Sequence, residues 1–249
     1  MNTPLWRENR YDLAGRVALV AGASGGMGSA VCAALLAGGA QVYALSGRER
    51  PDEQQQLRAD VGDASARLHF VVADARDEQA VSGVVADIVQ RANQLDILVN
   101  LIGGFAAGQP VTELETATFE RMLELNLRPT FLLSKYAARE MARHEWGRIV
   151  NFSSRAAHSG RRNAAAYAIA KAGVITLTET QAEETREQRI TVNAVLPSII
   201  DTPANRQGMP TANFDRWPKP AEIARVIAFL VSDDAALISG ASIPVYGLA

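Results

Sequence analysis

The chain has 249 residues, 48% of them apolar, and a formal net charge of -2 at pH 7. This length and apolar fraction suffice for a sizeable buried core, and α/β folds of roughly 250 residues often form one domain. Because Lys and Arg are scattered and the charge is close to neutral, the composition gives no indication of a nucleic-acid partner or of an acidic membrane.

Cysteine usage and the first residues bear on the compartment. The chain contains one cysteine, Cys32, so an internal disulfide is impossible and an oxidising compartment is not indicated. Residues 1–10 lack the apolar core of a signal peptide, and no run approaches the roughly 18 apolar residues of a membrane span. We therefore expect a cytoplasmic globular protein without a membrane partner.

Short apolar runs alternate with amphipathic stretches along the whole chain. The runs predict strands at residues 17–22, 40–45, 68–73, 95–100, 148–152, 190–196 and 241–245. Helical spacing of apolar residues predicts helices at residues 28–36, 77–92, 118–141, 164–181 and 221–231. Continuous apolar strands that alternate with helices are typical of βαβ units. The sequence therefore predicts an α/β fold: a Rossmann-type, doubly wound parallel sheet of about seven strands with helices on both faces.

Domain organisation follows from what separates these elements. No linker, repeat or low-complexity tract interrupts them, so we expect residues 1–249 to form a single domain. The one long irregular stretch is 202–220, which is rich in Pro, Asn and Gly. A loop of this length in a compact domain is often a lid, and we expect a substrate lid here with a short helix.

Glycines follow the first predicted strand directly and open the first predicted helix. Gly22, Gly26 and Gly28 have the spacing G-x3-G-x-G. Glycine lets the backbone turn tightly and approach a pyrophosphate, and a helix N-terminus offers free N–H groups to the phosphates. We expect Ser24 and Met27, which lie in the same turn, to contact the same group. The alternative is a tight turn that binds nothing.

The tip of the second strand distinguishes the two nicotinamide cofactors. An acidic residue at this tip selects the ribose of NAD. Here residues 40–45 are followed by Ser46, Gly47 and Arg48, without a carboxylate. A hydroxyl and an arginine suit a 2′-phosphate, so we predict that NADP(H) is favoured and that NAD(H) is the alternative. Arg48 could equally be a solvated loop charge.

A phenol and an ammonium stand four residues apart in the helix predicted at 164–181. At this spacing Tyr167 and Lys171 share one face of the helix, and a cation beside a phenol lowers its pKa. Ser154 follows the fifth strand, where ligands of α/β sheets bind, and its hydroxyl can hydrogen-bond a carbonyl oxygen. Asn126 is a polar residue in an apolar helical stretch, and a kink before Pro129 would also explain it.

Taken together, these residues resemble the short-chain dehydrogenase/reductase family over nearly the whole chain. The ordered set that carries the resemblance is Gly22, Gly26, Gly28, Asp74, Asn100, Asn126, Ser154, Tyr167, Lys171, Pro197, Thr202 and the run 220–224. The resemblance implies an oxidoreductase that interconverts a carbonyl and an alcohol with a nicotinamide cofactor and no metal. It also implies a homotetramer or homodimer, packed through the long helices that carry Asn126 and Tyr167.

The resemblance also implies a catalytic role for each of four residues. Ser154 would polarise the substrate carbonyl, and Tyr167 would donate or accept the proton. Lys171 would bind the nicotinamide ribose and lower the phenol's pKa. Asn126 would hold a water in a proton relay to Lys171.

Further residues are implied as cofactor contacts. Asp74 would hydrogen-bond near the adenine ring, and Asn100 would help hold the fourth strand beside the cofactor. Thr202 and the backbone near Pro197 and Ile200 would touch the nicotinamide carboxamide.

The chain departs from the family pattern at three places, none of which removes a catalytic group. Asn100 is followed by Leu101 rather than by Ala-Gly, and Tyr246 stands where an Asp is common. Ser198 replaces the glycine that usually follows Pro197. Because Ser tolerates positive φ poorly, the backbone conformation there is in doubt.

The sequence does not identify the substrate. A ketone or 3-oxoacyl compound is the family default, and a sugar or pterin reductase is an alternative. A dinucleotide sensor without chemistry is a second class of function, although a sensor needs no acid/base set. Arg155, Arg161 and Arg162 lie between Ser154 and Tyr167, where they would attract an anionic substrate or be solvated loop charges. Apolar side chains that line a pocket or simply pack are Phe105, Met209, Phe214 and Trp217.

Overall fold

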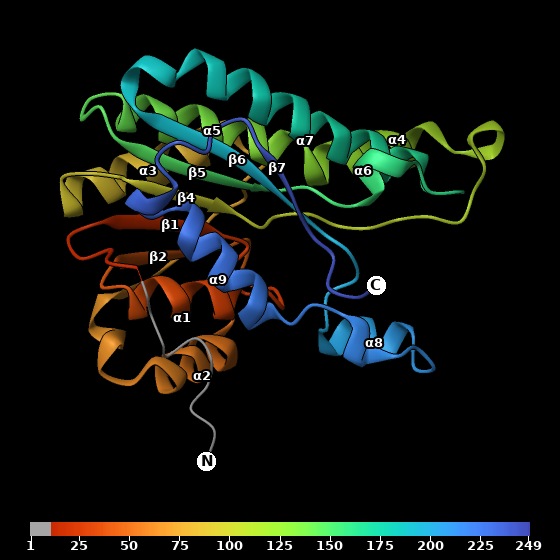
Figure 1. The fold of residues 1–249 in the computed structure, drawn as a ribbon, viewed down its shortest axis with the longest axis horizontal. Coiled ribbons are helices and arrows are strands. Elements are labelled where there is room, and N and C mark those ends of the chain that lie inside the picture. Colours follow the sequence, from red (N-terminus) through yellow and green to blue (C-terminus); the bar gives the residue numbers. More distant parts are fainter. Residues whose placement is uncertain (1–10) are drawn as a thin grey trace.

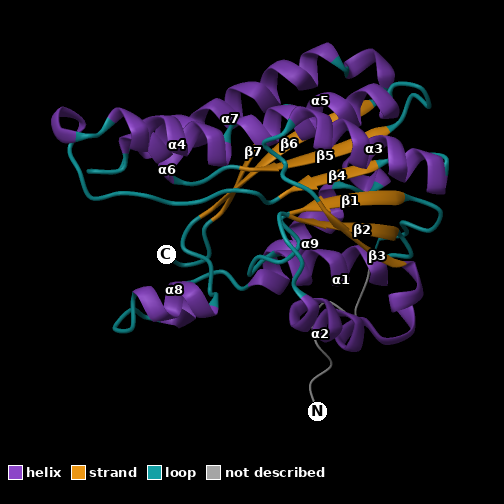
Figure 2. Ribbon diagram, turned by 180° about the vertical axis from the view of Figure 1, so that it is seen from behind, coloured by secondary structure: helices purple, strands orange, loops and turns teal. Residues whose placement is uncertain are grey.

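Seven parallel strands form one sheet in a computed structural model that describes residues 11–249 (Figures 1 and 2). The strands are β1 (Val17–Ala21), β2 (Gln41–Ser46), β3 (Leu68–Val72), β4 (Ile97–Asn100), β5 (Gly147–Phe152), β6 (Ile190–Pro197) and β7 (Ser242–Val245). Their order across the sheet is β3-β2-β1-β4-β5-β6-β7. The predicted doubly wound parallel sheet is therefore confirmed.

Helices cover both faces of this sheet (Figure 1). One face carries α1 (Gly28–Ala37), α2 (Pro51–Val61) and α9 (Pro220–Leu230). The other carries α3 (Glu78–Ala92), α5 (Arg128–Met141) and α7 (Ala165–Glu184). The helix α4 (Thr116–Asn126) packs on α7 and α5, while α6 (Ala156–Ser159) and α8 (Pro203–Gly208) are short.

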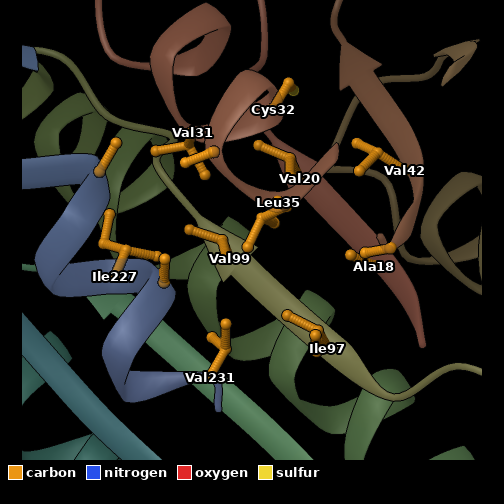
Figure 3. Packing of buried hydrophobic residues seen from close by; sticks show 14 of the residues in the cluster. Ala18, Val20, Val31, Cys32, Leu35, Val42, Ile97, Val99, Ile227 and Val231 are labelled. Atoms are coloured by element: carbon orange, nitrogen blue, oxygen red, sulfur yellow. The ribbon is translucent and has the colours of Figure 1, made fainter. Parts of the chain in front are cut away.

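The central strands are buried on both faces because helices cover each side. Along β1, Ala18 and Val20 point to the α1/α9 side, whereas Leu19 points to the α3/α5 side. Figure 3 shows the first of these cores, in which α1 and α9 pack their apolar side chains onto β1, β2 and β4. This two-sided burial explains why the strand sequences are apolar throughout rather than alternating.

The strand order reverses between β1 and β4. From β1 the chain builds β2 and β3 on one side, and then returns to place β4 on the other side of β1. Loops that leave β1 and β4 therefore diverge at the carboxyl edge, which is where doubly wound sheets bind ligands. Leu101, just after β4, donates its N–H to Ala21 O at 2.9 Å, which keeps the two strand ends together.

The predicted helix at 118–141 is wrong in one respect: it is two helices. The helix α4 ends at Asn126 and α5 begins at Arg128, with Leu127 between them. Pro129 stands in the first turn of α5, and because proline has no N–H it cannot continue the hydrogen-bond ladder of α4. The helix is thus interrupted at Leu127, two residues before Pro129.

The helix α2 was missed altogether. Its only buried residue is Leu57, so it carries almost no apolar period. The signal that could have found it is Pro51 at the first helical position, followed by Asp52 and Glu53 in the first turn.

Truncation of a core side chain tests this packing. Leu35 of α1 is completely buried, so we expect Leu35→Ala to lower the free energy of unfolding by about 2–5 kcal/mol. Urea denaturation followed by circular dichroism measures the change. The matched control is Leu237→Ala, since Leu237 is fully exposed and should shift stability by no more than about 0.5 kcal/mol. Equal effects of the two changes would contradict the described core.

Candidate active site

A cleft of about 1000 Å³ opens at the carboxyl edge of the sheet. Four loops form most of its wall, at residues 22–27 after β1, 101–105 after β4, 153–162 after β5 and 198–209 after β6. Asn126, Tyr167 and Lys171 complete it from helices α4 and α7. Segments far apart in sequence thus meet at the reversal point of the strand order.

Lys171 ties helix α7 to the end of β5. Its ammonium Nζ donates to Phe152 O at 2.7 Å, and the hydroxyl of Ser153 donates to Lys171 O at 2.7 Å. These two bonds run in opposite directions between the same pair of elements, and both are buried. Burial lowers the pKa of Lys171 to about 8, because a charged ammonium loses hydration there.

Tyr167 lies one helical turn before Lys171 and meets Ser154. The Ser154 hydroxyl hydrogen-bonds the phenol, which lowers the pKa of Tyr167, but burial raises it more, and the net change is upward. Lys171 is not among the causes of this shift, and its lowering of the phenol's pKa stays a prediction. The site withdraws both groups from water, so burial penalises the charged forms of the phenol and of the ammonium alike.

Asn126 anchors the loop after β4. Its Oδ1 accepts from Gly104 N at 3.1 Å, while Nδ2 donates to Gly104 O and to Met122 O, each at 3.0 Å. A Cβ on Gly103 would lie 2.7 Å from Asn126 Oδ1 and 2.9 Å from Lys171 Nζ. Only glycine fits between these two polar side chains, so the backbone of the loop passes directly beside them.

The glycine turn after β1 has free donors. The N–H groups of Gly26, Met27 and Ser29 have no hydrogen-bond acceptor within residues 11–249. Gly22 has φ +84°, and a Cβ on Gly28 would lie 2.1 Å from Ala23 O, so both positions require glycine. Unpaired N–H groups at the start of α1 fit the pyrophosphate of a dinucleotide.

Thr202 reaches across to this turn from the segment after β6. A Cβ on Gly26 would lie 2.7 Å from Thr202 Cγ2, so the two backbones approach closely only because residue 26 is glycine. The Thr202 hydroxyl accepts from Asn205 N and begins α8, and Asn205 Nδ2 donates to Ile200 O. The segment that contains α8 is therefore fastened at its start, beside the turn.

The tip of β2 carries Ser46 and Arg48. Ser46 is buried and its hydroxyl donates to Arg48 O at 2.9 Å. Arg48 is exposed, and its side chain makes no hydrogen bond or ion pair with any described residue. Among buried atoms nearby, the Nε of Arg50 also lacks a partner within the described part of the chain.

Asn100 and Asp74 are among the predicted contacts that do not line the cleft. Asn100 is buried at the end of β4; its Oδ1 accepts from Ile102 N, and its Nδ2 has no partner in the described residues. Asp74 is exposed beyond β3 and forms a two-pronged ion pair with Arg76, which lowers the pKa of this carboxyl to about 2.

The structure thus gathers most of the predicted site. Predicted residues that line the cleft are Gly22, Gly26, Met27, Asn126, Ser154, Tyr167, Lys171, Pro197, Ile200 and Thr202. Those outside its lining are Ser24, Gly28, Ser46, Arg48, Asp74 and Asn100. Phe105 and Met209 line it, whereas Phe214 and Trp217 contact each other, with ring centroids 5.0 Å apart.

Sequence reasoning missed Ser153 and Gly103. Ser153, directly after β5, donates the second hydrogen bond to α7 and forms a Ser-Ser pair with Ser154 in the sequence. Gly103 is half of a Gly-Gly pair directly after the fourth strand, a signal that was available. The departure at Ser198 is harmless, because its φ is not positive, and its hydroxyl donates to Tyr246 O at 2.7 Å.

Residues 11–249 contain neither a cluster of metal-ligand side chains nor a membrane-spanning helix. No group of three or more His, Cys, Asp or Glu side chains gathers there in a way that could hold a metal ion. Within the same residues, every helix is too short or too polar to cross a bilayer.

Comparison with known proteins agrees with this geometry. Residues 16–212 match the model of the short chain dehydrogenase family, and the chain belongs to this family of oxidoreductases. The cis-4-hydroxycyclohexanecarboxylate dehydrogenase of Sinomonas cyclohexanicum is 35% identical, over 93% of this chain and 95% of its own. The 3-oxoacyl-[acyl-carrier-protein] reductase of Pseudomonas aeruginosa is also 35% identical, over 95% of this chain and 98% of its own. A solved structure of ElxO with NADP bound is 27% identical, with a TM-score of 0.86, and the match covers 93% of this chain and 97% of that chain.

The lowered pKa of Lys171 has a consequence for stability. In the unfolded chain this lysine has its ordinary pKa of 10.5, so between about pH 8 and pH 10.5 the unfolded chain binds more protons than the folded one. Stability therefore rises with pH in this window. We expect the free energy of unfolding of the wild type, relative to that of Lys171→Met, to increase by about 3 kcal/mol across it.

Urea unfolding of both proteins at several pH values from 7 to 10.5 measures this difference. Met has similar length and no charge, so the comparison cancels the titration of every other group. A difference that stays constant with pH would mean that Lys171 is not desolvated.

Proposed function

We propose that the chain is an NADP(H)-preferring carbonyl reductase or alcohol dehydrogenase in which Tyr167 is the acid/base. The observation that carries this proposal is the phenol of Tyr167 held against the Ser154 hydroxyl, inside a cleft that the glycine turn and Lys171 also line. The bound nicotinamide supplies or accepts the hydride. The protein's own residues bind, orient and protonate.

Reduction needs a proton for the oxygen that becomes an alkoxide. Ser154 donates a hydrogen bond to the substrate carbonyl oxygen, and Tyr167 gives that oxygen its proton. Because burial raises the pKa of Tyr167, the phenol stays protonated near neutral pH and is ready to donate. In the oxidation direction, which needs the phenolate as base, the same shift favours higher pH.

Lys171 and Asn126 support Tyr167 and Ser154 by binding the cofactor ribose and a water, respectively. An ammonium has three N–H donors, and Phe152 O takes one of them, so two are left to hold the ribose hydroxyls next to the nicotinamide. Asn126 flanks the same loop residue, Gly103, and we propose that it holds a water that relays a proton to Lys171.

The substrate class is a ketone or a 3-oxoacyl compound. Of the two relatives described above, one is named as a reductase of 3-oxoacyl-[acyl-carrier-protein] and the other as a dehydrogenase of cis-4-hydroxycyclohexanecarboxylate. We propose that residues 202–220 act as the lid over this substrate, since Thr202, Asn205 and Met209 line the cleft.

Assembly as a homodimer or homotetramer stays a prediction. Exposed apolar side chains that such an interface would cover stand on α5 and α7: Phe131 is 47% exposed and Ile169 is 51% exposed.

The acid/base role is tested with Tyr167→Phe. We expect turnover to fall by at least about 10²–10⁴-fold, because the ring stays while the transferable proton is lost. NADPH binding should change less than severalfold. The measurement is NADPH oxidation with a panel of ketones, quinones and 3-oxoacyl thioesters, together with a fluorescence titration of NADPH. Equal turnover by the two proteins would remove Tyr167 from the mechanism, and NADPH binding without turnover by the wild type would favour a sensor.

Cofactor preference is tested with Arg48→Ala. A charge-assisted hydrogen bond to the 2′-phosphate contributes about 1.5–3 kcal/mol, so the Kd for NADPH should rise about 10- to 100-fold. The Kd for NADH, which lacks that phosphate, should not change and serves as the internal control. If the wild type binds both cofactors equally, or if the variant weakens both to the same extent, the preference for NADP(H) is wrong.

A further inference from the structure

The cleft has an uneven charge. Its charged lining side chains are those of Arg155, Arg161, Arg162 and Lys171, and no Asp or Glu side chain is among the described residues that line it. The chain as a whole has a net charge of -2, so this positive charge is local. A concave site lined by one sign of charge concentrates ligands of the opposite sign.

The three arginines differ in whether their guanidinium groups already have a hydrogen-bond partner within the protein. Arg155 donates to Ala249 O at 2.7 Å, and its guanidinium lies 5.0 Å from the ring centroid of Tyr246. Arg161 and Arg162 are exposed, and neither guanidinium makes a hydrogen bond or an ion pair with any described residue. Their guanidinium donors are therefore available to a ligand in the cleft.

The Phe105 ring lies between the Arg161 guanidinium and the Tyr167 phenol. The rings of Tyr167 and Phe105 meet edge to face, with centroids 5.0 Å apart. The Arg161 guanidinium lies 5.9 Å from the Phe105 centroid. A ligand whose carbonyl meets Tyr167 and Ser154 can thus cross the Phe105 ring and place its far end at the guanidinium.

The backbone holds these arginines at the cleft rather than leaving them on a free loop. Gly160 with φ +49° and Asn163 with φ +62° bracket the pair. Asn163 O accepts from Gly108 N at 2.8 Å, which joins the loop to the segment that carries Phe105. The pair also lies on a different loop from the free N–H groups of the glycine turn, which are the donors suited to a pyrophosphate.

We propose that the substrate is an oxo-carboxylate, or the corresponding hydroxy acid, whose carboxylate binds Arg161 and Arg162 while its carbonyl meets Tyr167. This rests on the proposed function and narrows its substrate class. Guanidinium groups bind carboxylates through paired N–H donors, and the Phe105 ring sets a spacer of several bonds between the two ends of the substrate.

The test compares acids with their neutral esters. The probes are 4-oxopentanoate, 5-oxohexanoate and 6-oxoheptanoate, each beside its methyl ester, with NADPH as cofactor. We expect the wild type to prefer at least one acid over its ester. The double variant R161Q/R162Q should raise KM for that acid about tenfold or more, with kcat little changed and the ester unaffected.

A matched charge control is Arg225→Gln, because Arg225 is exposed on α9 and does not line the cleft. It should leave the acid-over-ester preference unchanged. Binding is read separately in the Tyr167→Phe background with NADPH, where calorimetry should show the oxo acid binding and the added R161Q/R162Q changes abolishing it.

The outcomes separate this inference from the proposed function. If the wild type reduces none of the ketones tested here or in the wider panel, the proposed function fails. If it reduces ketones but not the oxo acids, or reduces acids and esters equally with no effect of R161Q/R162Q, the carboxylate site is overturned while the reductase remains.

Discussion

Two buried hydrogen bonds between helix α7 and the segment where β5 ends hold the candidate active site together. Lys171 Nζ donates to Phe152 O, and Ser153 Oγ donates to Lys171 O. In a region shielded from water such bonds are strong, and loss of either would leave a buried polar group unpaired. Ser154 directly follows Ser153, and Tyr167 lies one helical turn before Lys171. The two hydrogen bonds therefore bring the Tyr167 phenol to the Ser154 hydroxyl.

The rest of the cleft depends on how the sheet is wound. The reversal of strand order between β1 and β4 brings the glycine turn beside the loop that contains Gly103. That loop touches Asn126 and Lys171, and Thr202 closes onto Gly26 from the end of β6. Each close approach uses a glycine where a side chain would collide, so glycines mark the places where cofactor, loop and helix would come together.

Much of this could be predicted from the sequence, because the relevant signals are local. Apolar runs mark buried strands, and the spacing of Tyr167 and Lys171 puts them on one helical face. The glycine turn follows a strand and opens a helix, so its place in the fold could be predicted. The helix α2 could not be found by periodicity, since Leu57 is its only buried residue.

Properties that depend on residues distant in the sequence could not be predicted from it. The pKa of Tyr167 rises because the site as a whole buries it, and four-residue spacing from a lysine does not reveal that. The meeting of Thr202 with Gly26 joins segments more than 170 residues apart along the chain. Likewise, the unpaired state of Arg161 beside Phe105 becomes visible only when the loops are folded against each other.

A crystal structure of the protein with NADP⁺ and a bound hydroxy acid tests the central claim most directly. The account predicts that the substrate oxygen lies within hydrogen-bond distance of both the Tyr167 hydroxyl and Ser154 Oγ, while Lys171 Nζ remains on Phe152 O. A Tyr167 hydroxyl turned out of the cleft, or a substrate oxygen held by other groups, would contradict it.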